Sequence, residues 1–211
     1  SPRVYFYVQH DFASSSSTTA LHFGQLRDAY FDVGIDKKSQ FRFRIGQSKV
    51  PYGFENMQSS QNRLPLDRAD ALNSAVSNER DLGLFFYWAP TSKRKLFSTL
   101  VSSGLKGSGD YGVFGVGVYN GQTANRPELN PNKHIVTRIS YPFEIKKQIV
   151  EAGIQAYTGK VTLVSTSSGV NYATDKLYDD KRVAGTVVLY PKPFGILAEY
   201  TIGRGPQFDK T

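Results

Sequence analysis

Arginine and lysine side chains carry the chemistry that is most visible in this sequence. Arg42 and Arg44 alternate with Phe41, Phe43 and Ile45, so both guanidinium groups share one face of a predicted strand. Further cations stand in or beside the polar stretch that follows, and on a later predicted strand: Lys49, Arg63, Arg68, Arg80 and Arg138. A guanidinium donates two parallel N–H groups to an oxyanion, and an ammonium offers a compact positive charge. These residues therefore predict non-covalent binding of anions.

Each of these cations except Arg138 has a second interpretation, which is an ion pair that only supports the structure. A hairpin turning at Lys37-Lys38 would place Arg42 and Arg44 beside Asp28 and Asp32 on the neighbouring strand. The cations of the polar stretch also have candidate partners nearby: Glu55, Asp67, Asp70 and Glu79. From the sequence, pairing and contact with a solute both remain open.

Covalent, metal and cofactor chemistry lack a supporting pattern. The sequence has no cysteine, and His10, His22 and His134 show no spacing typical of a metal site. It contains neither a glycine-rich phosphate loop nor the motif of a serine nucleophile. We therefore expect no enzyme, no cofactor and no metal.

The net charge of +8 limits the class of partner. Nucleic acid, an anionic membrane surface and an anionic solute are the three candidates. The only dense basic run is Lys93-Arg94-Lys95, which we expect in a turn at a membrane surface, and the other cations are spread along strand-like segments. A distributed charge favours an enclosed lumen and argues against nucleic acid.

The elements that must position these cations are about ten strands, each predicted from alternating apolar and polar residues. They are Arg3–Phe12, Gln25–Asp36, Gln40–Ser48, Asp81–Ala89, Lys95–Ser103, Tyr111–Asn120, His134–Phe143, Ile149–Gly159, Arg182–Tyr190 and Phe194–Gly203. A helical pattern is visible only within Leu66–Ala75.

The connections alternate between short and long, and aromatic residues gather at the predicted strand ends. Both features are typical of antiparallel transmembrane β-barrels, whose apolar residues face lipid and whose polar residues line the interior. We therefore expect an all-β fold in which residues 1–211 form one barrel domain, itself incomplete. A long loop at about residues 49–80 is expected to fold inward.

A family resemblance rests on the run from Phe43 to Gly53, which reads FRIGQSKVPYG, and continues through Glu55–Ser60, ENMQSS. Arg80–Leu84 and Val118–Gly121 add support. These segments resemble the phosphate-selective porin O/P family. The resemblance implies a bacterial outer-membrane barrel of about 16 strands, larger than this chain supplies, which assembles as a homotrimer. It also implies a constriction loop in the lumen and basic side chains that attract phosphate-like anions.

The function expected from these observations is passive diffusion of small solutes through an outer-membrane porin, biased toward anions such as phosphate. Outer-membrane lipid, small anions and further copies of the chain are the expected partners, without nucleic acid. A non-conducting barrel that acts as a scaffold or binds a partner is one alternative. A soluble β-sandwich that buries the apolar face of the same strands is the other.

Overall fold

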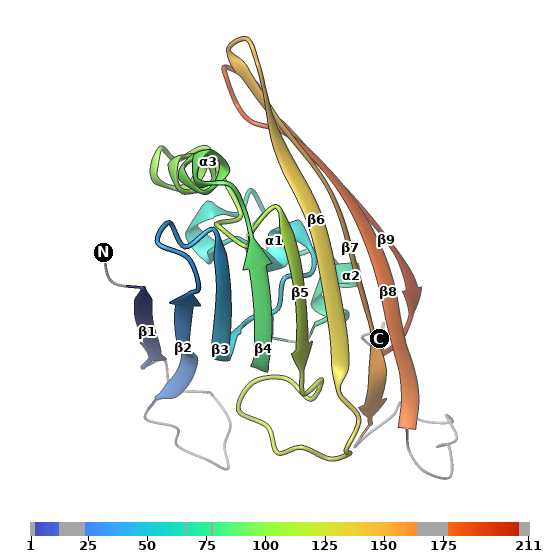
Figure 1. Cartoon of the computed structure of the whole chain (residues 1–211). Helices are drawn as coiled ribbons and strands as arrows, with labels where there is room; N and C mark the ends of the chain where they lie inside the picture. Colours follow the sequence, from blue (N-terminus) through green and yellow to red (C-terminus); the bar gives the residue numbers. More distant parts are fainter. Residues whose placement is uncertain (1–2, 13–23, 66, 77, 164–176, 207–211) are drawn as a thin grey trace.

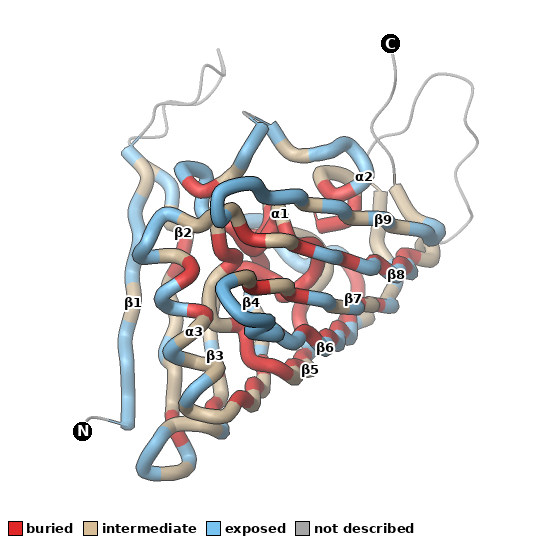
Figure 2. Tube along the Cα trace, turned by 90° about the horizontal axis from the view of Figure 1, so that it is seen from above, coloured by how far each residue is buried: buried red, intermediate tan, exposed pale blue. Residues whose placement is uncertain are grey.

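Nine antiparallel strands form one sheet in the computed structural model, which describes residues 3–12, 24–65, 67–76, 78–163 and 177–206. The strands are β1 (Val4–Asp11), β2 (Gln25–Gly34), β3 (Phe41–Lys49), β4 (Arg80–Trp88), β5 (Phe114–Tyr119), β6 (His134–Ile145), β7 (Gln148–Thr162), β8 (Leu177–Leu189) and β9 (Ile196–Arg204). Each strand pairs with its neighbour in sequence, and the sheet curves into an open arc between β1 and β9 (Figures 1 and 2). This arrangement confirms the all-β antiparallel prediction and is consistent with the wall of a porin barrel.

The helical segments are short except for one. They are α1 (Phe54–Met57), the 3-10 turn η1 (Ser60–Asn62), α2 (Asp70–Asn73) and α3 (Thr91–Ser102). None of the helices in the described residues has the length and apolar character needed to cross a membrane. Helix α2 lies within the segment in which a helical pattern was predicted, and α1 and η1 fall in the polar stretch.

The strand predicted over Lys95–Ser103 is wrong, because residues 95–102 belong to α3 and Ser103 caps its end. Leu96, Phe97, Leu100 and Val101 recur at helical spacing, and the helix buries Phe97 and Leu100 on one side. The expected turn at Lys93-Arg94-Lys95 is wrong for the same reason, since the run lies in the first turns of α3. Helix α3 sits at the end of the sheet where the β6–β7 turn lies (Figure 1).

The two faces of the sheet differ in polarity. Along β6, Ile135 and Ile139 are 50% and 54% exposed, whereas Val136 and Arg138 between them are buried. Similarly exposed apolar side chains occupy the outward positions of the other strands, including Phe31, Ile45, Leu84, Val118, Ile154 and Val187. An apolar outer face over a polar inner face is the pattern of a barrel wall in lipid.

The buried core lies on the concave face, between the sheet and the connection that joins β3 to β4. We call this connection, residues 50–79, the inner loop. Its buried residues pack against inward-facing side chains of β4 to β8, among them Phe85, Tyr119, Val136, Tyr157 and Ala184. In Figure 1, α1 and α2 lie behind the strands on the concave side, as the burial of Val50, Tyr52 and Leu72 requires.

Candidate functional site

The inner loop is fastened to the far side of the arc by polar contacts. The Glu199 carboxylate on β9 accepts hydrogen bonds from the backbone N–H of Phe54 at 2.9 and 3.1 Å. The hydroxyls of Tyr52 and Thr201 lie 2.5 Å apart, and the Tyr157 hydroxyl donates to the carbonyl of Ala75 at 2.7 Å. The loop therefore crosses the concave face and does not extend away from the end of the sheet.

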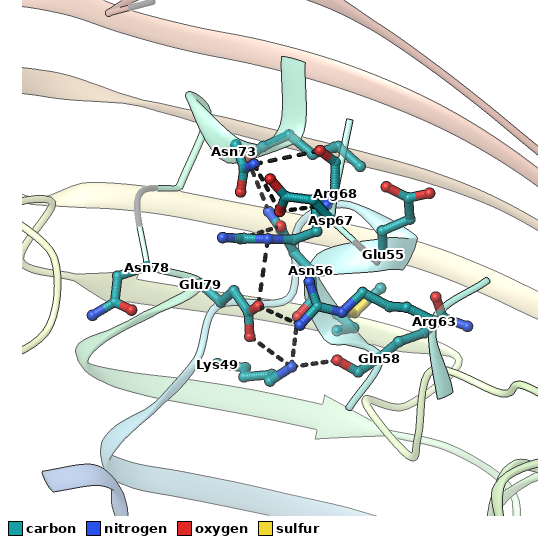
Figure 3. A network of polar contacts seen from close by, with 12 residues as sticks. Lys49, Glu55, Asn56, Gln58, Arg63, Asp67, Arg68, Asn73, Asn78 and Glu79 are labelled. Carbon is teal, nitrogen blue, oxygen red and sulfur yellow. Dashed lines mark hydrogen bonds and ion pairs between the residues drawn. The ribbon is translucent and has the colours of Figure 1, made fainter. Parts of the chain in front are cut away.

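Four of the predicted cations meet at one carboxylate, and Figure 3 shows three of them, Lys49, Arg63 and Arg68, around Glu79. Glu79, at the end of the inner loop, lies 2.8 Å from the Lys49 ammonium and 3.0 Å from Arg80. Arg63 and Arg68 each approach the other oxygen of the carboxylate at 3.4 Å. Glu79 is 4% exposed. We call this group of five residues the Glu79 cluster.

The Glu79 cluster carries an excess of positive charge. Its four cations face Glu79 and two outside carboxylates: Asp28, which Arg80 contacts at 3.0 Å, and Asp67, whose charge acts on Arg63 and Arg68. Burial raises the pKa of Glu79, but the neighbouring Lys49 charge, with Arg68 and Arg80, outweighs burial and holds that pKa below its usual value. The carboxylate is therefore ionised at neutral pH, and the cluster remains net positive.

Arg44 is held by the neighbouring strand, as one of the two predicted interpretations requires. Its Nε and one terminal nitrogen donate to the two oxygens of Asp32 at 2.7 and 2.8 Å. Its guanidinium carbon also lies 4.0 Å from the centre of the Tyr30 ring. The pairing of Arg44 with Asp32 is confirmed, and it orients the guanidinium on the concave face.

Arg42 takes a partner that the sequence analysis did not identify. It contacts Asp110, in the connection between α3 and β5, at 2.5 Å, and Arg94 of α3 contacts the same carboxylate at 2.8 Å. Burial opposes ionisation of Asp110, but its bonds to Arg42 and Arg94 lower its pKa below the usual value. Arg42 therefore pairs with neither of the two aspartates that the hairpin was expected to place beside it. Asp28 pairs with Arg80, and Asp32 pairs with Arg44.

Two hollows on the concave face connect these groups. The first, of about 360 Å³, lies between the inner loop and β1–β4, and we call it the loop hollow. Five cations and three carboxylates line it: Arg27, Arg44, Lys49, Arg63 and Arg80, with Asp11, Asp28 and Glu79. The second, of about 620 Å³, lies toward α3 and is called the end hollow. Six cations and two carboxylates line it: Arg3, Lys37, Lys38, Arg42, Arg44 and Arg94, with Asp32 and Asp110.

Tyr30 and Arg44 line both hollows, so the basic surface continues from one to the other. A small anion that reached the end hollow would meet Arg44 before the Glu79 cluster. The arrangement offers several charged contacts in sequence.

Two predicted residues lie outside these hollows. Arg68 contacts Glu79 and donates to the Asn56 side chain at 2.8 Å. Arg138 is 1% exposed, donates to the Gly112 carbonyl at 2.9 Å and lies 3.6 Å from Glu151. Both cations therefore support the inner surface and line neither the loop hollow nor the end hollow.

Three residues that line the hollows were not predicted from the sequence: Asp110, Arg27 and Ser108. Ser108 and Asp110 lie in a glycine-rich stretch whose composition indicates a turn but not its inward path. Among the described residues, no group of three histidine, aspartate or glutamate side chains is placed to hold a metal ion.

A comparison with protein families matches residues 2–210 to the model described as phosphate-selective porin O and P. No curated protein and no solved structure gives a significant match.

Proposed function

The chain belongs to the family of phosphate-selective porins O and P, and from this membership we propose that it is a bacterial outer-membrane porin with a bias toward anions. Small solutes diffuse passively through its lumen, and phosphate-like oxyanions are the class that the inner surface suits best. Membership of a porin family indicates a channel rather than an enzyme.

The outer-membrane location is supported by the convex face of the sheet. Rows of exposed apolar side chains cross neighbouring strands in register, as with Phe31, Ile45, Leu84, Val118 and Ile135. Exposing such an apolar band to water is unfavourable. A bilayer can cover it without loss of hydrogen bonds, because the backbone groups of the strands are already paired within the sheet. The soluble β-sandwich would bury this face, so the exposure of the band argues against that alternative.

The anion bias is carried by one observation, which is the excess of cations over carboxylates in both hollows. A positive lumen raises the local concentration of anions and lowers that of cations. Because Arg44 and Arg42 already donate to Asp32 and Asp110, each offers a solute only part of its donor set. Weak contact at several successive sites is what conduction requires.

The alternative of a non-conducting scaffold draws on the inner loop, which covers much of the concave face. The two hollows favour conduction, because they leave lined space beside the loop on the concave face. Assembly as a homotrimer with lipid around it is part of the same proposal and rests on the family resemblance alone.

The test is single-channel recording of the full-length protein in planar bilayers, with reversal potentials under a salt gradient and with phosphate added. The proposal expects an anion-selective current that phosphate reduces. Lys49→Gln removes a cation that lines the loop hollow. It should therefore shift the reversal potential toward the value expected for a cation-selective channel. Lys147→Gln, an exposed turn residue, is the matched control. A folded, inserted barrel without current would favour the scaffold.

A further inference from the structure

The connection between α3 and β5, residues 103–113, folds back onto the inner loop from the opposite end of the sheet. The Gln58 side chain of the inner loop donates to the carbonyl of Lys106 at 2.5 Å, and the Lys106 ammonium donates to the Gln61 carbonyl at 3.4 Å. The Tyr111 hydroxyl donates to the Met57 carbonyl at 3.5 Å. Two segments that enter from different ends therefore meet on the concave face.

Apolar packing holds α3 in the same place. Phe97 and Leu100 are buried in a cluster that includes Phe54 of the inner loop, with Ile149 and Val188 from the wall. Figure 1 shows α3 above α1 at the end of the sheet, where this packing occurs. The helix therefore anchors one end of the connection.

Asp110 anchors the other end. Its carboxylate contacts Arg42 and Arg94, and its backbone carbonyl accepts a second hydrogen bond from Arg42. Arg138 donates to the carbonyl of Gly112, two residues further along. Because α3 and Asp110 fix both ends, the residues between them have a defined position.

Three of those intervening residues, Gly107, Ser108 and Gly109, line the loop hollow, which Arg63 also lines. A Cβ at Gly107 would lie 2.9 Å from Cβ of Leu100, and Gly109 has a φ of +108°, so both positions favour glycine. Ser108 is 5% exposed, and its hydroxyl has no hydrogen-bond partner among the described residues. An unpaired buried hydroxyl is unfavourable unless a ligand or water completes its hydrogen bond.

We propose that residues 103–113 form a second wall of the constriction and that the Ser108 hydroxyl is a specificity contact for oxyanions. This inference rests on the proposed porin function. A hydroxyl donates to an oxyanion oxygen and also accepts from a protonated oxyanion such as hydrogen phosphate, whereas chloride only accepts. Ser108 therefore discriminates by hydrogen-bonding capacity, while Lys49 and Arg63 across the hollow supply charge.

Thiol labelling tests the position of this wall, because the chain has no cysteine of its own. The variant Ser108→Cys is treated with a negatively charged methanethiosulfonate reagent while single channels are recorded. A unit negative charge about 7 Å from the path lowers the anion current about threefold. Ser102→Cys, exposed on α3, is the control and should label without a change in current. Attachment of the reagent is verified by mass spectrometry.

Ser108→Ala tests the specificity contact. The phosphate concentration that halves the chloride current should rise about fivefold, as expected for the loss of one hydrogen bond. The chloride conductance itself should change little.

The outcomes separate the two proposals. If the unmodified protein carries no anion current, the proposed function fails. If the current is present but labelled Ser108→Cys conducts like labelled Ser102→Cys, the second wall is refuted. Failure of Ser108→Cys to label in a folded channel refutes it as well, and an unchanged phosphate block in Ser108→Ala refutes the specificity contact.

Discussion

Replacing Glu79 by glutamine tests whether one carboxylate fastens the inner loop to the wall. The substitution keeps the size of the side chain and removes its charge. Four cations then face each other, with Asp28 and Asp67 as the remaining carboxylates that act on the group. The change therefore affects both the stability of the loop and the electrostatic potential of the loop hollow.

The effect on stability should be the larger one. Removing one partner of a buried ion pair costs about 3–5 kcal/mol, because the remaining charge stays buried without compensation. The side chain of Glu79 is 5% exposed, and its partners are 7–12% exposed, so this estimate applies to them. In contrast, one unit of charge about 7 Å from a passing anion changes its energy by about 0.6 kcal/mol in water. We expect the free energy of unfolding to fall by about 3 kcal/mol.

Denaturant unfolding of the protein in detergent measures this change, with single-channel recording for the potential. Glu55→Gln is the matched control, because it removes the same charge from the same loop. Glu55 accepts a hydrogen bond from the backbone of Ala69 and lies outside the Glu79 cluster. Channels of Glu79→Gln should conduct anions better per opening but close or fluctuate more often.

The role of Glu79 in fastening the inner loop is refuted if the two variants unfold at the same denaturant concentration. That result would mean that the cations repel each other little without Glu79, and that the apolar packing of the inner loop alone holds it in place.

Three further predictions concern the wall, the outer face and pH. Arg44→Lys keeps the positive charge but loses the two parallel hydrogen bonds from the guanidinium to Asp32. Anion selectivity should therefore persist, while the free energy of unfolding measured in denaturant falls by about 1–2 kcal/mol. Ile154→Arg, on the outer face, should destabilise the inserted protein by about 2–4 kcal/mol relative to Thr158→Arg, which lies nearer the strand end. Refolding into vesicles measures both free energies, and equal effects would contradict a lipid-facing surface. The folded pKa of Glu79 is lowered, so its contribution to stability is complete above its ordinary pKa of about 4.5 and is lost as pH falls through the lowered value. Acid unfolding of Glu55→Gln should therefore retain this transition, and acid unfolding of Glu79→Gln should lack it.

The wall of the fold could be predicted from the sequence because its signal is local. Alternation around Arg42 and Arg44 indicates a strand with a polar face, and β3 has that pattern. The hairpin from β2 to β3 also sets its own register, which places Asp32 opposite Arg44. Helix α3 was predicted as a strand although the apolar pairs Leu96-Phe97 and Leu100-Val101 are separated by a polar pair, a period near four that indicates a helix.

The ion pairs of the inner surface depend on contacts between residues far apart in the sequence, which no local pattern predicts. In the β2–β3 register Arg42 lies opposite Gly34, so Asp28 is out of its reach and pairs with Arg80 of β4. Asp110 reaches Arg42 only because α3 returns the chain to the concave face.

The sequence by itself determined the antiparallel strands, the polar face of each strand, the excess of positive charge and the family. The tertiary structure alone decided which cations line a hollow, as Arg63 and Lys49 do, and which support the wall, as Arg138 does. The physical reason is the separation along the sequence of the residues that interact. Side-chain alternation and hairpin register depend on residues close together in the sequence. The contact of Gln58 with Lys106 depends instead on how two connections pack on the same curved surface.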